Sequence, residues 1–254
     1  MGSQTVTRGY VRPRAYVRVQ GPDAADLLQR IVSNDVLAAD VCEALLLTAK
    51  GRVIAPLLVW RRGEDDFLLL TEPELGAVVL EHLRRMRIAS RCEIELEEHT
   101  STIVLGNTAG DGIPTRDYGV PAFELLDPPF EPEPADDRLE RLRILARTPR
   151  WGREIDDGIL PAEAGLDGRA VSFSKGCYPG QEPLARLHNR GHVNRTLRVL
   201  DVAGEVRQAD EVVYDAGVVG RITSAVPGLA LAYVRVEVPD GAEVEVGGTP
   251  ARLH

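Results

Sequence analysis

The spacing of apolar residues over the first 105 positions limits this chain to a fold that mixes strands and helices. Residues 14–20 alternate apolar and polar side chains, which is the period of a half-buried strand. Pro22 and Asp23 then open a helix, with an acid near the positive end of its dipole. Further strands are predicted at residues 43–49, 53–60, 67–71, 93–97 and 102–105, and a second helix at 73–87. This order favours a ferredoxin-like or related α+β layer over a dinucleotide-binding parallel sheet.

The remainder of the chain divides into a loop, a helix and a β-rich end. Residues 127–137 carry four prolines among acids and cannot form a core element, so we expect a surface loop or linker there. Helical apolar spacing resumes at Leu139 and stops at Pro149. From Asn194 onward, short β-rich runs alternate with Gly, Pro and Asp turns, which predicts a small barrel or sandwich.

Length and composition are those of a globular protein. The 254 residues are 44% hydrophobic and 27% charged, which suits one large domain or two to three small ones. No apolar run approaches the roughly 20 residues that span a bilayer, and Met1 to Gln20 lacks the apolar core of a signal peptide. We therefore expect a cytoplasmic protein without membrane association. The net charge of −9 argues against direct nucleic-acid binding by the protein as a whole.

The basic residues are almost all arginines. Lys50 and Lys175 are the two lysines among 30 basic residues, and each precedes a glycine. Arginine serves equally well as a surface charge, whereas a compact ammonium beside a glycine can approach an anion or change its pKa. The two lysines therefore mark candidate functional segments, although coincidence explains them as well.

Cys42, Cys92 and Cys177 are odd in number and far apart, which argues against a disulfide framework or a zinc knuckle. The first two lie beside apolar runs and are interpreted as small buried hydrophobes. Cys177 instead follows a predicted strand at residues 170–173 and precedes a predicted type II turn at residues 178–181, where a side chain can be displayed. The alternative is a turn cysteine kept for packing.

Lys175 lies two residues before Cys177, on the same face if the strand extends that far. A nearby ammonium would enrich the thiolate, which attacks electrophiles and binds metal. Together with Cys177, His188 and His192 supply three possible metal ligands, but histidines in a solvent-facing loop are the commoner outcome, and we assign no metal site.

Positive charge is concentrated in two segments. Residues 172–198 carry five basic residues against one acid, and residues 1–22 carry Arg8, Arg12, Arg14 and Arg18 without an acid. The two segments could share one electropositive cleft that binds an anion, or they could be separate solvated arginine faces.

The run Lys175-Gly176-Cys177-Tyr178-Pro179-Gly180-Gln181-Glu182, followed by Ala185-Arg186, resembles the K-G-C-[FY]-x-G-Q-E-x-x-A-R signature of the YgfZ-type folate-binding proteins. These proteins are relatives of the glycine-cleavage T-protein, an aminomethyltransferase, and the mitochondrial members assist iron–sulfur cluster assembly. Further blocks similar to the family lie at residues 21–24, 33–36, 50–53, 161–166 and 220–224.

The resemblance implies three domains in a ring around a channel that receives tetrahydrofolate, with a small C-terminal β-barrel. It implies a folate-binding domain of residues 1–42 plus 150–193, an inserted α+β domain of residues 43–149, and a barrel of residues 194–254. It also implies a cytoplasmic role linked to tRNA modification, with a reduced folate and iron–sulfur client or assembly proteins as partners. Cys177 and Lys175 are the implied catalytic residues. The implied folate-binding residues are Asn34, Asp35, Tyr178, Gly180, Gln181, Glu182 and Arg186.

Two positions depart from the aminomethyltransferase pattern. Ala55 and Pro56 stand where T-proteins carry a pair of aspartates, so glycine-cleavage activity is not expected. Leu145 stands where T-proteins carry a glutamate that contacts the pterin, and a leucine cannot accept a hydrogen bond from a pterin amine. The expected function is a folate-binding accessory protein for iron–sulfur cluster assembly or repair. The alternatives are a folate-dependent aminomethyl or one-carbon transferase and a non-catalytic folate-binding module.

Overall fold

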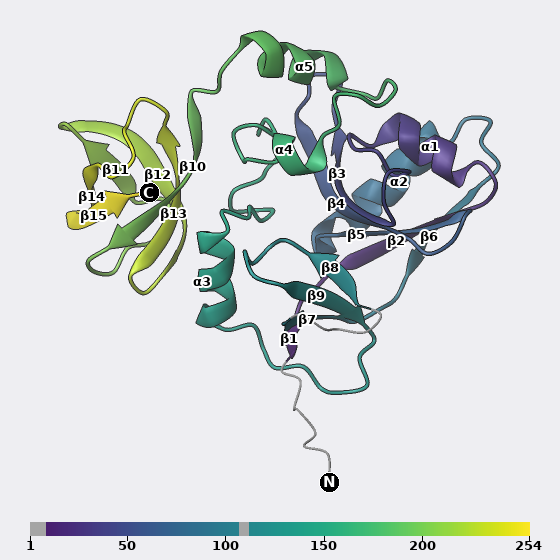
Figure 1. The fold of residues 1–254 in the computed structure, drawn as a ribbon, viewed down its shortest axis with the longest axis horizontal. Coiled ribbons are helices and arrows are strands. Elements are labelled where there is room, and N and C mark those ends of the chain that lie inside the picture. Colours follow the sequence, from purple (N-terminus) through teal and green to yellow (C-terminus); the bar gives the residue numbers. More distant parts are fainter. Residues whose placement is uncertain (1–8, 107–111) are drawn as a thin grey trace.

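The computed structural model describes residues 9–106 and 112–254, so Arg8 lies outside the described residues. Over these ranges the strands form a five-stranded sheet, a four-stranded sheet and a closed six-stranded barrel, and helices pack around them (Figure 1). The predicted α+β class and the C-terminal barrel are confirmed. None of the helices in the described ranges is long and apolar enough to cross a membrane.

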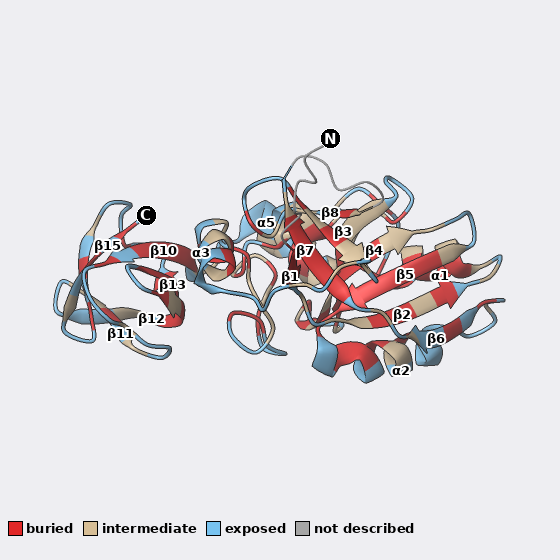
Figure 2. Cartoon of the chain, turned by 90° about the horizontal axis from the view of Figure 1, so that it is seen from below, coloured by how far each residue is buried: buried red, intermediate tan, exposed pale blue. Residues whose placement is uncertain are grey.

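The five-stranded sheet is antiparallel and runs in the order β3-β4-β5-β2-β6. Its strands are β2 (Ala15–Gln20), β3 (Val41–Leu47), β4 (Val53–Arg61), β5 (Asp66–Thr71) and β6 (Glu93–Glu97). Helices α1 (Ala24–Ile31) and α2 (Gly76–Met86), the latter preceded by the 3₁₀ turn η1 (Pro73–Leu75), bury their apolar sides in one core with the inward residues of this sheet. The opposite face is covered as well, so β5 is buried along nearly its whole length (Figure 2). This explains why residues 67–70 form a continuous apolar run.

The outer side of α2 differs from the prediction. Helical spacing over residues 73–87 predicts that Val78, Val79, Leu83 and Met86 share one buried side. Val79 and Leu83 are buried, whereas Val78 and Met86 are 43% and 40% exposed. The helix begins at Gly76, after the 3₁₀ turn, and this changes the rotation of the residues that follow.

The four-stranded sheet lies against the first and runs in the order β1-β7-β9-β8. Its strands are β1 (Gly9–Val11), β7 (Ser101–Leu105), β8 (Ile113–Thr115) and β9 (Ala122–Leu126). The expected domain boundary between residues 42 and 43 falls inside β3, and β2 pairs with β5 and β6 across it. The first two expected segments therefore share one sheet, and the division into domains stays a prediction.

The C-terminal barrel closes in the order β10-β13-β12-β11-β14-β15, with β10 pairing with both β13 and β15. Its strands are β10 (Arg195–Val202), β11 (Glu211–Tyr214), β12 (Gly217–Val226), β13 (Leu229–Arg235), β14 (Glu243–Val246) and β15 (Thr249–Leu253). Closure leaves no unpaired sheet edge. The short strands β11 and β15 were not predicted from the sequence.

A buried polar network connects helix α3 (Asp137–Leu145) to the barrel. Arg143, 2% exposed, donates to Glu154 at 3.1 Å and to the Ser224 hydroxyl at 2.7 Å, and Ser224 donates to Glu154 at 2.6 Å. Glu140 accepts two further bonds from the same guanidinium. The Arg143 charge is thus fully paired at the junction between α3 and β12.

Arg143→Ala should therefore destabilise the protein, because it leaves the fully buried Glu154 without its guanidinium. We expect the free energy of unfolding to fall by about 3–5 kcal/mol in denaturant titrations followed by circular dichroism. Arg221→Ala is the control, since Arg221 pairs with Glu211 on the exposed barrel surface and should change stability by less than about 1 kcal/mol. Equal effects of the two variants would contradict the assignment.

His99 connects the ends of β6 and β9. Its Nδ1 lies 2.6 Å from Asp127 Oδ2 and its Nε2 lies 2.9 Å from Glu97 Oε2, while its ring meets Tyr16 edge-on. Partial burial disfavours the imidazolium, but the hydrogen bonds to Asp127 and Glu97 outweigh it and raise the pKa of His99 above its usual value.

The contribution of His99 to stability should therefore depend on pH. A raised pKa in the folded state means that the contribution is complete below about pH 6.5 and disappears as the pH rises through the folded-state pKa. We expect His99→Gln to lower the free energy of unfolding more at about pH 5.5 than at about pH 9. A difference that stays constant across this range would show that the charge on His99 contributes nothing.

Candidate functional site

The signature segment forms a loop between α4 (Asp167–Ala170) and α5 (Gln181–Arg190). The strand predicted at residues 170–173 is wrong: Ala170 ends α4, and residues 171–180 contain no strand. The backbone groups here bond to the segment after α1 instead of to a neighbouring strand. Ser172 N donates to Ser33 O at 2.9 Å, and the Ser33 hydroxyl donates to Ala170 O at 2.5 Å. Hydrogen bonds to the segment after α1 thus hold this loop in place of the strand pairing that the sequence predicted.

The predicted turn at residues 178–181 is present. Gly180 has φ +83° and ψ 1°, and Gln181 N donates to Tyr178 O at 3.3 Å, as in a type II turn. A β-carbon at Gly180 would lie 2.5 Å from Thr48 O and 3.1 Å from the α-carbon of Gly51. The backbone of the Lys50-Gly51 turn therefore packs directly against the signature turn, and the two lysine–glycine segments meet in space.

Lys175 points inward and anchors the loop. Its ammonium donates to Val32 O and to Asn34 O, each at 2.7 Å, and lies 5.2 Å from the centre of the Tyr178 ring. Burial lowers the pKa of Lys175 to about 8, and the nearby Asp35 only partly offsets this effect. The structure thus gives Lys175 a role in holding the loop, and its expected effect on the Cys177 thiolate stays a prediction.

Cys177 is exposed, whereas Cys92 is buried and Cys42 is partly buried. Burial raises the pKa of Cys42 to about 11, which keeps that thiol protonated at neutral pH. The two neighbours of the exposed Gly176-Cys177 pair, Lys175 and Tyr178, are both buried. The loop therefore presents the Cys177 thiol outward between two anchored side chains.

Asn34 and Asp35, which were also expected to bind folate, make contacts within the protein. Asn34 Nδ2 donates to Glu43 O at 2.7 Å and to Arg169 O at 3.2 Å, and Asp35 Oδ1 accepts from Gln29 and from the backbone of Leu37. These contacts hold α4 and β3 together beside the signature loop. Their expected role in folate binding stays a prediction.

The expected folate-binding residues on α5 differ in exposure. Gln181 is half-buried, whereas Glu182 and Arg186 are exposed, and neither forms an ion pair with another described residue. Tyr178 is buried and donates to Ser172 O at 3.0 Å, and burial raises the pKa of Tyr178 to about 12. Tyr178 therefore packs beneath the loop, and the exposed residues of α5 remain available to a ligand.

His188 lies on α5, and His192 lies exposed in the segment that follows this helix. The His188 ring stacks on Phe173 with the ring centres 4.2 Å apart. Across the described part of the chain, no group of three or more His, Cys, Asp or Glu side chains is placed to hold a metal ion.

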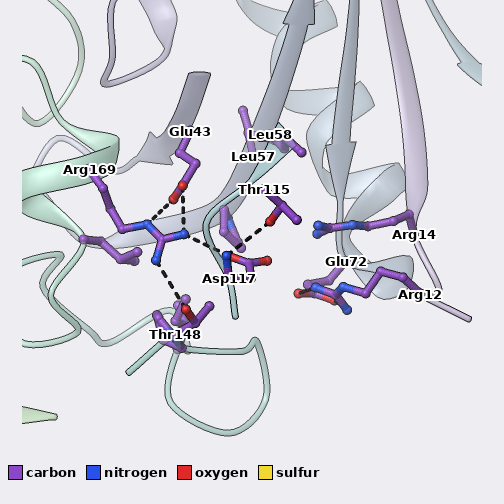
Figure 3. Close-up of a pocket in the computed structure, with 14 residues that line it drawn as sticks. Arg12, Arg14, Glu43, Leu57, Leu58, Glu72, Thr115, Asp117, Thr148 and Arg169 are labelled. Carbon is purple, nitrogen blue, oxygen red and sulfur yellow. Dashed lines mark hydrogen bonds and ion pairs between the residues drawn. The ribbon is translucent and has the colours of Figure 1, made fainter. Parts of the chain in front are cut away.

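A small cavity of about 60 Å³ lies between the five-stranded sheet, α4 and the loop after β8 (Figure 3). Its volume is well below the roughly 300–1,000 Å³ typical of small-molecule sites. Its polar lining consists of Arg12, Arg14, Glu43, Glu72, Thr115, Asp117, Thr148 and Arg169. Only Arg12 and Arg14 among these residues were expected from the sequence, because the three acids come from three separate segments and form no motif.

The arginines of the cavity are paired with acids. Arg12 bonds both oxygens of Glu72 at 2.8 and 3.1 Å, and Arg14 bonds both oxygens of Glu124 at 3.0 Å. Burial disfavours the charge on Glu72, but Arg12 outweighs it and lowers the pKa of Glu72. Arg12 and Arg14 are therefore paired inside the protein, and the basic residues of the signature segment do not line this cavity.

Arg169 of α4 binds two carboxylates at once. It bonds both oxygens of Glu43, and its Nη2 also donates to Asp117 Oδ1 at 2.8 Å (Figure 3). Burial raises the pKa of Glu43 although Arg169 acts in the opposite direction. The helix that precedes the signature loop is thus tied to the wall of the cavity.

The two positions that depart from the aminomethyltransferase pattern differ in their relation to this cavity. Ala55 is buried in the sheet core, and Pro56 lines the cavity together with Leu57 and Leu58. Leu145 is 53% exposed and does not line the cavity. The wall of the cavity at Pro56 is therefore apolar.

Part of the chain matches a known domain family, and named proteins are similar to most of it. Residues 11–110 match the GCVT N-terminal domain. The iron–sulfur cluster assembly factor IBA57 homolog of Neurospora crassa is 27% identical over 226 residues, covering 72% of this chain and 51% of that protein. This chain thus spans about half the length of that relative. The tRNA-modifying protein YgfZ of Pectobacterium atrosepticum is 29% identical over 240 residues, covering 78% of this chain and 71% of that protein.

The fold has a close counterpart among solved structures. The crystal structure of the glycine cleavage system aminomethyltransferase T from Bartonella henselae superimposes with a TM-score of 0.80, covering 98% of this chain and 86% of that one. At 17% sequence identity this likeness establishes the fold alone. The domain match and the named relatives make the chain similar to the YgfZ/IBA57-type proteins of the aminomethyltransferase superfamily.

Proposed function

We propose that this chain is a folate-binding accessory protein for the assembly or repair of iron–sulfur clusters, with Cys177 as its essential thiol. The observation that carries the proposal is the display of Cys177 on a loop whose flanking residues are anchored inside the protein. The relative from Neurospora crassa is named as an iron–sulfur cluster assembly factor, which supports the same conclusion.

The chemistry of an exposed thiol suits this role. A thiolate is the form that binds iron and attacks electrophiles, and it must be accessible to a cluster or a client protein. Cys177 meets that requirement, whereas Cys92 is buried and Cys42 has a raised pKa. A cluster would be cargo that this protein handles, with Cys177 supplying one ligand or one nucleophile.

Folate binding is proposed from the signature segment and not from the cavity beside Arg169. That cavity, at about 60 Å³, is well below the size of a small-molecule site, and the Arg12 guanidinium on its wall already bonds both oxygens of Glu72. A bound reduced folate would supply a carrier for one-carbon units. The exposed residues Glu182 and Arg186 on α5, next to the Cys177 loop, are the ones available to hold it.

The alternative of an aminomethyl or one-carbon transferase receives less support. At the position where the resemblance to T-proteins would place an acid, Ala55 is in the sheet core and Pro56 lines the cavity. No carboxylate is therefore available at that point to receive a proton from a reacting amine.

The thiol assignment is tested by complementation. Cys177→Ala should abolish rescue of cluster-dependent enzyme activity in a strain that lacks its own assembly factor, because the exposed thiol is lost while the fold is unchanged. Cys92→Ala is the matched control, since Cys92 packs in the core of the five-stranded sheet, and it should rescue fully if the protein folds. Full rescue by Cys177→Ala would refute the assignment of the thiol.

Folate binding is tested separately by calorimetry. The wild-type protein should give saturable heat with tetrahydrofolate below about 100 µM, a range typical of a small-molecule site with both apolar and charged contacts. The absence of heat at high micromolar ligand would remove folate from the proposal and leave the thiol role to be judged by complementation alone.

A further inference from the structure

A larger cavity of about 340 Å³, here called the α5 pocket, lies between α5, α4 and the residue that follows β13. Its volume falls within the roughly 300–1,000 Å³ typical of ligand sites, which is ample for one aromatic side chain. Most of its lining is apolar and comes from Ala162, Phe173, Leu184, Leu187, Val193 and Val236. The proposed roles of the thiol and of folate leave this pocket unassigned.

Three polar side chains also line the α5 pocket. His188 is stacked on Phe173, His192 lies beyond the end of α5, and Asp167 supplies the one carboxylate of the lining. A tryptophan side chain combines a large apolar ring with a single N–H donor. An apolar space with one carboxylate at its wall therefore suits a tryptophan better than it suits a charged ligand.

Helix α5 presents cations to the solvent. Arg186 and Arg190 are four residues apart, which places them on the same side of the helix, and both are exposed. Lys50 is exposed too, and a β-carbon on its neighbour Gly51 would lie 3.2 Å from the Leu184 side chain of α5. None of these three cations forms an ion pair with another described residue. We call Lys50, Arg186 and Arg190 the cationic strip.

The cationic strip belongs to a protein that is acidic as a whole. The chain carries a net charge of −9, whereas Glu182 is the single acid of residues 172–198. The other basic residues of that segment are buried or ion-paired: Lys175, Arg195 and Arg198. A short acidic segment is therefore attracted to the strip, whereas a long polyanion such as RNA is repelled by the surrounding surface.

We propose that α5 is the docking site of an acidic segment of a partner protein, with an aromatic side chain of that segment seated in the α5 pocket and its carboxylates on the cationic strip. Helix α5 begins four residues after Cys177 and has ten residues, or a length of about 15 Å. In Figure 1 the chain runs from α5 to β10, so a docked segment would lie between the thiol loop and the barrel. The identity of the partner as a cluster-handling protein rests on the proposed function, whereas the docking site rests on the pocket and the charges.

Fluorescence anisotropy with three labelled peptides tests both parts of this surface. The first peptide carries one tryptophan between glutamates, the second has alanine in place of the tryptophan, and the third has glutamines in place of the glutamates. Burial of an aromatic side chain corresponds to roughly 10- to 100-fold in affinity, so the first peptide should bind at least about 10-fold tighter than the second. It should also bind tighter than the third, and this advantage should shrink as the salt concentration rises.

Two variants separate the pocket from the strip. Val236→Asn puts a polar group on the pocket wall without a change of charge and should reduce the preference for the first peptide over the second by about 5-fold or more. Val218→Asn, at a similarly exposed valine of β12, is its control. Arg190→Glu should weaken the first peptide by about 3- to 10-fold and leave the third unchanged, and Arg138→Glu at an exposed arginine of α3 is its control.

The outcomes separate this inference from the proposed function. Equal affinity of the wild-type protein for the first and second peptides overturns the docking site and leaves the thiol role to complementation. Displacement of the first peptide by a single-stranded RNA that binds more tightly, and that is weakened by Arg190→Glu, overturns the protein partner in favour of a nucleic acid. Full rescue by Cys177→Ala refutes the thiol role, and the peptide preferences would still support the docking site.

Discussion

Buried and partly buried pairs of arginine and carboxylate join the separate sheets, helices and barrel of this protein. Arg14, which directly precedes β2, binds Glu124 of β9, and Arg169 of α4 binds Glu43 of β3. Arg143 of α3 binds Glu154 at the junction with the barrel. Each pair links segments that no strand pairing connects. A planar guanidinium suits this role because its fixed fork bonds both oxygens of a carboxylate. Such a pair costs desolvation, so what it adds is a defined geometry more than net stability.

The fixed donor geometry of the guanidinium also bears on why a lysine stands at position 175. Lys175 inserts its ammonium between the carbonyls of Val32 and Asn34, a space defined by two backbone oxygens and not by a carboxylate. A planar guanidinium presents its donors in a rigid fork and would not fit that arrangement equally well. Lys50, in contrast, is exposed, and its segment contributes to the site through the backbone of Gly51. The two lysine–glycine segments are thus related by packing, with only one of the ammonium groups buried.

Most of the fold could be predicted from the sequence, because a strand or helix with a regular apolar period can be recognised from its own residues alone. The strand at residues 170–173 was predicted wrongly, since four residues are too few to define a period and their partners lie about 140 positions earlier in the chain. The cavity could not be predicted for the same reason. Arg14 and Glu124 are 110 residues apart, and Arg169 and Glu43 are 126 apart. The signature identified the loop that carries the thiol, but the acids that line the cavity belong to no motif.

The contact between Gly180 and Gly51 has a mechanical consequence. The two turns touch through their backbones, with positive φ at both glycines and no side chain between them that could adjust its rotamer. A side chain at Gly180 would therefore push the two turns apart. Since β3 and β4 also carry Glu43, Pro56 and Leu57 on the cavity wall, the signature turn rests on the same two strands that form that wall.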